Sequence, residues 1–152
     1  MEYDIRCEHV SSRPLAVVRR RAKVAELPKV IPAACGEVWN AVKARQLTGG
    51  RLVALYLDDE MNIEVGVELD APIADGNGMF ASATPAGEAA AAVHFGPYQR
   101  LAEAHQAIRR WCVTHNRTMA GVNWEVYAHW QDAWKDNPSA IRTDVFYLLK
   151  PE

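Results

Sequence analysis

Ten residues in the C-terminal third of the chain read Gly-Val-Asn-Trp-Glu-Val-Tyr-Ala-His-Trp (121–130), and they place one carboxylate in an apolar, aromatic run. Side chains on a strand alternate between faces, so Glu125 and Tyr127 would share one face and Trp124 and Val126 the other. Glu is uncommon in strands, and a carboxylate is costly to bury. Glu125 therefore either points to solvent from a half-wet antiparallel sheet or belongs to a functional site.

The segments around this run carry strand and helix signals in a fixed order. Residues 87–95 form a strand-like run that ends at a Gly-Pro pair, and Pro97 is well placed for a first helical turn. From 97 to 115 apolar residues recur at three- and four-residue steps, which is typical of an amphipathic helix. After a turn-rich stretch, the last strand is expected at 141–150.

The first half of the chain shows a similar order. Short strands are expected at 3–10 and 13–24, and helical spacing follows over 31–47 until a Gly-Gly pair ends it. Two further strands, 51–58 and 61–70, should pair as a hairpin.

The strand at 61–70 alternates strictly between apolar and polar residues. Ile63 and Val65 fall on one face, whereas Glu64 and Glu68 fall on the other. Because an antiparallel sheet commonly has one wet face, we expect both acids to face solvent.

The order strand, helix, strand, strand thus occurs twice, in modules at about 1–70 and 79–152. The stretch 71–78 between them contains Pro, Gly and Asn and reads as a connecting loop. This repetition predicts an α+β fold of two pseudo-twofold modules, with helices on one face of antiparallel sheets and a cleft between the modules. The 152 residues suffice for one such domain, 1–152.

Charge and composition argue against several classes of function. The chain has 17 Lys and Arg against 19 Asp and Glu, a formal net charge of −2, so it lacks the basic field that holds a phosphate backbone. No direct nucleic-acid binding is expected. No stretch approaches the roughly 18 apolar residues of a membrane span, and the first residues are acidic where a signal peptide is basic. A cytoplasmic protein without a membrane role is expected.

Cysteines and histidines give no sign of a metal or cofactor. Cys7, Cys35 and Cys112 form no Cys-x-x-Cys pair and are expected to be reduced thiols. The five histidines show no close metal-ligand spacing, so no metal site is expected. No cofactor is implied either, because haem needs an axial ligand and neither His94 nor His105 has a supporting context.

Three motifs resemble those of one known family. They are His-Phe-Gly-Pro-Tyr (94–98) before a helix, Trp-Glu-Val-Tyr (124–127), and Arg-Thr-Asp-Val-Phe (142–146). In order and spacing they resemble the GyrI-like (gyrase-inhibitory-protein-like) small-molecule-binding family, which includes the effector-binding domains of multidrug-sensing AraC- and MerR-type regulators. The likeness spans nearly the whole chain. Its length leaves no room for a helix-turn-helix, so it looks like a free-standing member.

The resemblance implies a cleft between the two modules with an acidic residue, here Glu125, at its floor. Tyr56 matches the tyrosine that the family places on the strand after the first helix. Phe146, which stands where relatives commonly carry tyrosine, is expected to bind the ligand too, and Tyr147 is expected to point to the opposite face. Further aromatic residues are expected as cleft walls on weaker grounds: Trp39, Trp111, Tyr127 and Phe80.

Two functions follow from this resemblance. The first is binding of lipophilic, often cationic, aromatic small molecules, because a carboxylate in a lowered dielectric attracts a cation and aromatic rings add cation–π attraction. The alternative is a hydrolase that opens electrophilic cyclopropane rings of genotoxic natural products. There Glu125 would be the acid or base, assisted by Tyr127 or His129. A gyrase-interacting protein, which the family name suggests, has no residue signature here, and the oligomeric state is not indicated.

Overall fold

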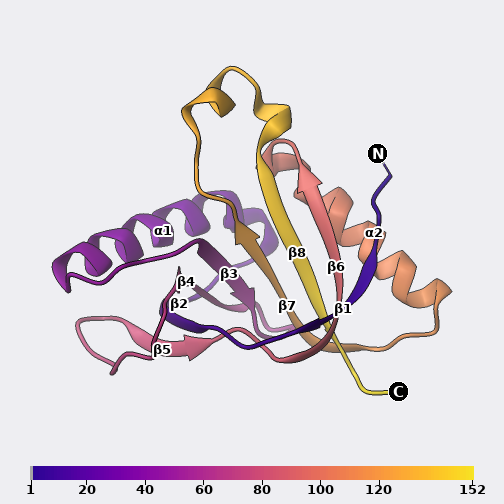
Figure 1. Ribbon diagram of the computed structural model, residues 1–152, viewed down its shortest axis with the longest axis horizontal. Coiled ribbons are helices and arrows are strands. Elements are labelled where there is room, and N and C mark those ends of the chain that lie inside the picture. The colour runs from indigo at the N-terminus through magenta and orange to yellow at the C-terminus, as the bar shows by residue number, and fades with distance from the viewer. Residues whose placement is uncertain (1) are drawn as a thin grey trace.

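The structure, a computed structural model, describes residues 2–152. In this part of the chain eight strands form one antiparallel sheet in the order β1-β6-β8-β7-β3-β4-β2-β5 (Figure 1). The strands are β1 (Arg6–Val10), β2 (Pro14–Arg21), β3 (Leu52–Tyr56), β4 (Asn62–Glu68), β5 (Phe80–Ala83), β6 (Gly87–Phe95), β7 (Met119–Tyr127) and β8 (Arg142–Leu149). The predicted α+β class is confirmed. The two expected sheets are a single sheet, because β3 of the first half and β7 of the second half pair with each other.

Two α-helices flank this sheet, α1 (Leu27–Ala44) and α2 (Leu101–Thr114), and Figure 1 shows them at opposite ends of the molecule. α1 begins four residues before the predicted start at 31. Pro28 lies in its first turn, where a missing N–H costs nothing, and Pro32 follows one turn later. Four short 3-10 helices complete the structure: η1 (Val24–Glu26), η2 (Tyr98–Arg100), η3 (Asp132–Lys135) and η4 (Pro138–Ala140).

The strand register shows that both helices lie on the same face of the sheet. A row of directly paired residues crosses it through Val65, Ala54, Glu125, Val145 and Ala92. Paired residues point to the same face. Val65 packs in the α1 core, and Val145 and Ala92 pack in the α2 core. Glu125 therefore lies on the helix-covered face, between the two helices.

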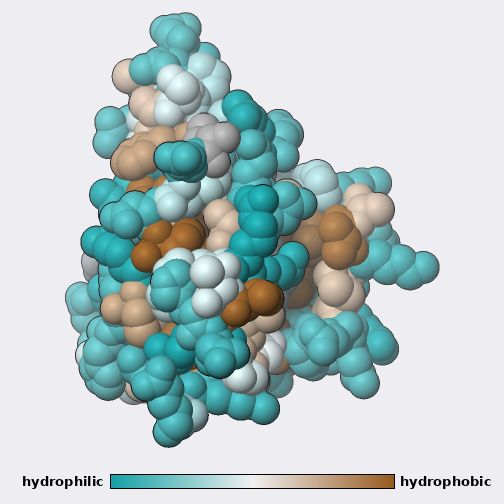
Figure 2. Space-filling view, turned by 90° about the vertical axis from the view of Figure 1, so that its right-hand side faces the viewer, coloured by the Kyte–Doolittle hydropathy of each residue, from teal (hydrophilic) through white to brown (hydrophobic). Residues whose placement is uncertain are grey.

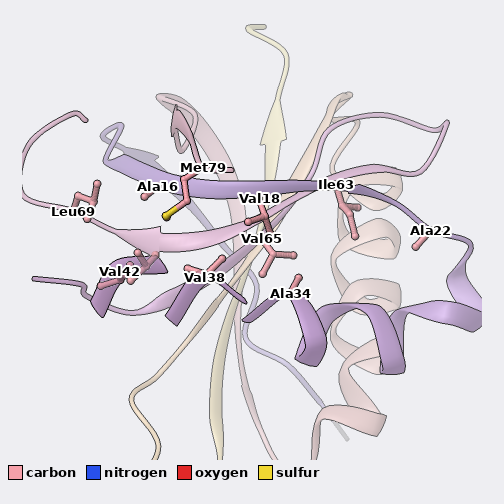
Figure 3. Close-up of a cluster of buried hydrophobic side chains, with 11 residues drawn as sticks. Ala16, Val18, Ala22, Ala34, Val38, Val42, Ile63, Val65, Leu69 and Met79 are labelled. Atoms are coloured by element: carbon pink, nitrogen blue, oxygen red, sulfur yellow. The ribbon is translucent and has the colours of Figure 1, made fainter. Parts of the chain in front are cut away.

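Each helix has its own hydrophobic core. α1 places Ala34, Val38 and Val42 against β2 and β4, as Figure 3 shows. α2 places Ala104 and Ile108 against β6 and β8. Burying an aliphatic side chain of this size stabilises the fold by about 1.5–3 kcal/mol. The packing of these buried apolar side chains thus holds both helices on the sheet.

A third core lies on the opposite face of the sheet and draws on both halves of the chain. Its buried members are Leu15, Val17, Val53, Leu55, Ala89, Trp124 and Val126. They alternate along their strands with residues of the helix-covered face, such as Ala54 and Glu125. This shared core binds the two halves together from behind the sheet.

Glu64 and Glu68 are only 6% and 4% exposed, so the expectation that they face solvent is wrong. β4 runs between β2 and β3 inside the sheet, and basic and hydroxyl side chains cover its polar face. Glu64 accepts hydrogen bonds from Ser82 at 2.5 Å and from Arg19 at 3.2 Å, and Glu68 accepts one from Arg51 at 2.9 Å. Burial alone would raise the pKa of Glu68, but the hydrogen bond and charge of Arg51 outweigh it and lower that pKa.

The segment 128–141, between β7 and β8, protrudes at the top of Figure 1. β7 ends at Tyr127, whereas the predicted strand continued to residue 130. His129 and Trp130 are exposed in this protrusion. None of the helices in residues 2–152 has the length and apolar character needed to span a membrane.

Candidate functional site

Glu125 lies in the middle of β7 and is 4% exposed, so the solvent-facing alternative is excluded. Its neighbour across the strand pair is Ala54, whose small side chain leaves the carboxylate room on the helix-covered face. Trp124 and Val126 point to the other face and anchor β7 in the shared core. The alternation of large apolar residues thus forces the acid inward, between α1 and α2.

Three side chains from three elements hold the Glu125 carboxylate. Tyr127 donates to Oε1 at 2.5 Å, and Tyr56, at the end of β3, donates to the same oxygen at 3.2 Å. His105 of α2 places Nε2 at 2.6 Å from Oε2. A buried carboxylate is tolerated only with such compensation. Both oxygens are therefore occupied by donors within the protein.

A further residue lies behind the histidine. Tyr147 of β8 places its hydroxyl at 2.6 Å from Nδ1 of His105, with the two rings edge to face at 5.5 Å between centroids. The Arg109 guanidinium lies 5.6 Å from the centroid of the Tyr147 ring. A continuous chain of hydrogen bonds thus runs from Tyr147 through His105 to Glu125, with a cation at its outer end.

The phenol groups around Glu125 hold their protons tightly. Burial, followed by the negative charge of Glu125 and the hydrogen bond to it, raises the pKa of both Tyr127 and Tyr56 well above the ordinary value. Burial and Glu125 raise the pKa of Tyr147 to about 12, although Arg109 opposes the shift. All three hydroxyls therefore stay protonated at neutral pH.

On its outer side the site is bordered by Tyr98 and Cys35. The Tyr98 ring, just before α2, meets the Tyr127 ring edge to face at 5.7 Å between centroids and is 42% exposed. Cys35 of α1 is half-buried, and burial raises the pKa of its thiol. Tyr98 is therefore an aromatic side chain that reaches from the tyrosines around Glu125 to the surface.

Two of the predicted wall residues lie on the opposite face of the sheet. Phe146 pairs with Trp124 in the register and stacks on it at 5.1 Å between centroids. Phe80, on the edge strand β5, pairs with Val17 and lies beneath the Arg19 guanidinium. Both phenylalanines pack against the shared core, so the structure does not bring them to Glu125.

The two predicted tryptophans also lie away from the carboxylate. Trp39 is 42% exposed on α1, with the Lys43 ammonium 6.0 Å from its ring. Trp111 stacks on His115 at 4.3 Å between centroids and, with Tyr3, lines a shallow hollow of about 390 Å³. Of the predicted residues, the structure therefore brings Tyr56 and Tyr127 to Glu125 and leaves the others apart.

Neighbouring side chains cover Glu125 almost completely and leave it 4% exposed. The hollow beside Trp111 and a second hollow of about 490 Å³ between α1 and the loop before β5 both lack Glu125 in their lining. Figure 2, viewed from the side of α2, shows a largely hydrophilic surface with separate hydrophobic patches. A molecule that reaches Glu125 must therefore part the side chains that cover it.

Sequence reasoning missed His105 and Tyr147 as partners of Glu125. His105 lies beside the buried stripe of α2, next to Ala104, and a polar residue at the border of an apolar stripe is the one signal for it. Tyr147 is indeed on the face opposite to Phe146, but that face is the one that contains Glu125. In residues 2–152 no three His, Cys, Asp or Glu side chains gather as metal ligands.

Comparisons with known proteins identify the fold. Residues 3–150 match the family model described as the GyrI-like small molecule binding domain. The C-terminal domain of EcmrR superposes with a TM-score of 0.81 at 18% identity, covering 100% of both chains. SAV2435 bound to tetraphenylphosphonium gives a TM-score of 0.66 at 10% identity, covering 99% of this chain and 94% of that chain.

A hydrolase from Listeria innocua gives a TM-score of 0.61 at 10% identity, covering 96% of this chain and 91% of that chain. At such identities these likenesses show a shared fold. The comparison with curated proteins gives no match.

Proposed function

The chain belongs to the GyrI-like small molecule binding domain family, and we propose that it binds lipophilic, often cationic, aromatic molecules at Glu125. The observation that carries this proposal is the burial of that carboxylate among aromatic side chains. At 4% exposure it is screened from water, so a cation beside it is attracted more strongly than at the surface. A relative in fold, SAV2435, has been solved with the lipophilic cation tetraphenylphosphonium.

The rings around the acid suit such a ligand. Tyr56, Tyr127 and Tyr98 present aromatic surface from three different elements. Each ring face that meets a cation adds roughly 0.5–2 kcal/mol of attraction. An aromatic cation therefore meets both a negative charge and aromatic surface here.

In the absence of ligand the same side chains satisfy the acid themselves. The side chains of Tyr127 and His105 contact one carboxylate oxygen each, so the protein itself compensates the buried acid. Binding requires the outer ring of Tyr98 to separate from Tyr127, which opens a path between α1 and α2. The pocket is thus expected to form as the ligand enters.

Comparing the affinities of a charged and an uncharged ligand distinguishes the contribution of the carboxylate from that of the aromatic rings. We expect Glu125→Gln to weaken tetraphenylphosphonium binding by about tenfold to a hundredfold, or roughly 1.4–2.7 kcal/mol. Binding of the neutral triphenylphosphine oxide should change little. Isothermal titration calorimetry at fixed pH measures both.

Glu64→Gln is the matched control for this experiment. Glu64 is a comparably buried glutamate in the same sheet, but on the face away from the helices, so its loss removes the same charge at a different place. We expect it to leave both affinities within about twofold, less than 0.5 kcal/mol. Equal losses for the charged and neutral ligands in Glu125→Gln would refute the proposal.

The hydrogen bonds at Glu125 also favour a second candidate, a hydrolase of electrophilic cyclopropanes. Ionised Glu125 would take a proton from an attacking water, whose oxygen bonds to a ring carbon while a ring carbon–carbon bond breaks. The Tyr127 hydroxyl would donate a hydrogen bond to the group that receives the electron pair of the broken bond, and the proton on Glu125 would then pass to that group. One water is then added and the ring is opened. A fold relative described as a hydrolase is consistent with this chemistry.

Turnover distinguishes the two candidates. Incubation of an electrophilic cyclopropane with the protein should give the water-added product in excess over protein, and Glu125→Gln should abolish it. Protection of the compound in a one-to-one ratio, with no product, would leave binding alone.

A further inference from the structure

His105 is the nearest nitrogen base to the carboxylate, at 2.6 Å between Nε2 and Oε2. The proposed ligand cation would seek the same oxygens. We propose that His105 and the ligand cation compete for Glu125, so that binding of a cation releases a proton from His105. This inference rests on the proposed function, because it concerns the same site and adds its regulation by pH.

The hydrogen bonds allow His105 to gain and lose a proton without leaving a group unpaired. As imidazolium it donates from Nε2 to Glu125 and from Nδ1 to the hydroxyl oxygen of Tyr147. As neutral imidazole it still donates from Nε2, while Tyr147 reverses its role and donates to Nδ1. The tyrosine hydroxyl accepts or donates equally well, so both protonation states fit one geometry.

Other titratable or charged groups surround His105 and Glu125. They are Tyr56 (β3), Tyr127 (β7), Tyr147 (β8), Arg109 (α2), Tyr98 (η2) and Cys35 (α1). Burial raises the pKa of Cys35 and of the four tyrosines, so these groups stay neutral between pH 5 and 8. An arginine stays positive throughout. Histidine is the side-chain type that commonly changes charge between pH 5 and 8, so His105 is the residue of this cluster through which pH would act on the site.

The charges at the site determine whether cation affinity rises or falls with pH. A ligand cation beside Glu125 repels a second positive charge, so the bound state favours neutral His105. In the free protein Nε2 of His105 lies 2.6 Å from the carboxylate, and a bound cation would offset the attraction of that carboxylate for a proton on the ring. Cation affinity should therefore rise with pH, by up to about tenfold per pH unit where the free protein carries the proton and the complex does not.

Calorimetric titration with tetraphenylphosphonium tests this directly, because that cation has no titratable group. Wild-type protein titrated from pH 5.5 to 8.0 in two buffers of different ionisation enthalpy gives both the affinity and the number of protons released. We expect release of up to one proton per cation, with weaker binding at low pH. Triphenylphosphine oxide, which is neutral, should show neither effect.

His105→Gln keeps an N–H donor near Glu125 but cannot titrate. In this variant we expect no proton release from the site and an affinity that no longer rises between about pH 6 and 8. His115→Gln is the matched control, since that exposed histidine stacks on Trp111 elsewhere on α2 and should leave the wild-type profile unchanged.

The outcomes separate this inference from the proposed function. Binding that depends on Glu125 but shows constant affinity and no proton exchange would overturn the inference and leave the proposed function intact. Absence of binding at any pH would overturn both. If His105→Gln does not fold, NMR of the wild-type protein tests the inference instead. The nitrogen chemical shifts of the His105 ring should change from those of imidazolium to those of neutral imidazole when the cation is added, and unchanged shifts would overturn the inference.

Discussion

At the scale of the residue, Glu125 sets the properties of the phenols around it. Tyr56 and Tyr127 donate to the same carboxylate oxygen, and each loses part of this interaction if it ionises. A negative charge on either ring would also lie directly beside the acid. The structure therefore ties the ionisation of these tyrosines to a single carboxylate.

All five tyrosines have raised pKa values: Tyr3, Tyr56, Tyr98, Tyr127 and Tyr147. Ultraviolet absorbance of tyrosinate should consequently show little ionisation of the folded protein at pH 10, the ordinary pKa of a phenol. In Glu125→Gln part of the absorbance should appear at lower pH, because one cause of the shift is removed. Identical titration curves for both proteins would contradict the geometry around Glu125.

The raised tyrosine pKa values also predict how the free energy of unfolding changes at alkaline pH. A group that holds its proton more tightly in the folded state contributes stability that is present below its unfolded pKa of about 10 and is lost as pH rises towards the folded pKa. The free energy of unfolding should thus be level up to about pH 9 and fall above it. Urea denaturation at a series of pH values measures this, and a level profile to pH 12 would disprove it.

The residues of the site were only partly predictable. Strand alternation places Glu125 and Tyr127 on one face, and the family resemblance adds Tyr56. The partner from α2, His105, depends on how that helix docks, which no local pattern encodes. The face of Phe146 depends on its register with β7, and a shift of one residue in pairing reverses every side chain.

At the scale of the element, two glycines show opposite requirements. A Cβ on Gly66 in β4 would lie 2.2 Å from the Ala16 carbonyl oxygen and 2.5 Å from Val17. A Cβ on Gly36 in α1 would meet nothing within 4 Å. The close approach of β2 to β4 thus requires glycine at position 66. The helix α1 does not require glycine at position 36.

We expect Gly66→Ala to destabilise the fold by about 1–3 kcal/mol or more, because the new methyl group overlaps backbone. Gly36→Ala should stabilise it by about 0.5–1 kcal/mol, since alanine loses less conformational freedom in a helix. Chemical denaturation of the two single variants provides the comparison. A stable Gly66→Ala protein would show that β2 and β4 lie further apart than the structure has them.

Element types follow well from the sequence, and their ends follow less well. Helical spacing locates α1, but the two prolines at 28 and 32 conceal its first turn. The apolar run through Trp130 suggests a longer strand, yet pairing with β3 and β8 stops at Tyr127. Long-range pairing, not local preference, ends that strand.

At the scale of the whole molecule, the seam between β3 and β7 makes one sheet from two repeats. The repeated order of elements predicts two modules, but composition gives no sign that their inner strands pair. The shared core behind the seam takes Leu15 and Val53 from the first half and Trp124 from the second. The halves therefore depend on each other for burial of apolar surface.

The protein should accordingly unfold in one cooperative step. We expect the fluorescence of a variant retaining only Trp39 and that of a variant retaining only Trp124 to report the same denaturation midpoint, since Trp39 lies in the first half and Trp124 in the second. Leu55→Ala should lower both midpoints together, by about 2–5 kcal/mol in free energy. Two separated transitions would show that the modules fold independently.

A crystal structure of the complex with tetraphenylphosphonium tests most directly whether Glu125 receives a cation. The predicted result has the phosphonium among the rings at the acid, with Tyr98 and Tyr127 further apart than their present 5.7 Å. A phosphonium seated only in the hollow beside Trp111, with the side chains over Glu125 still closed, would contradict it.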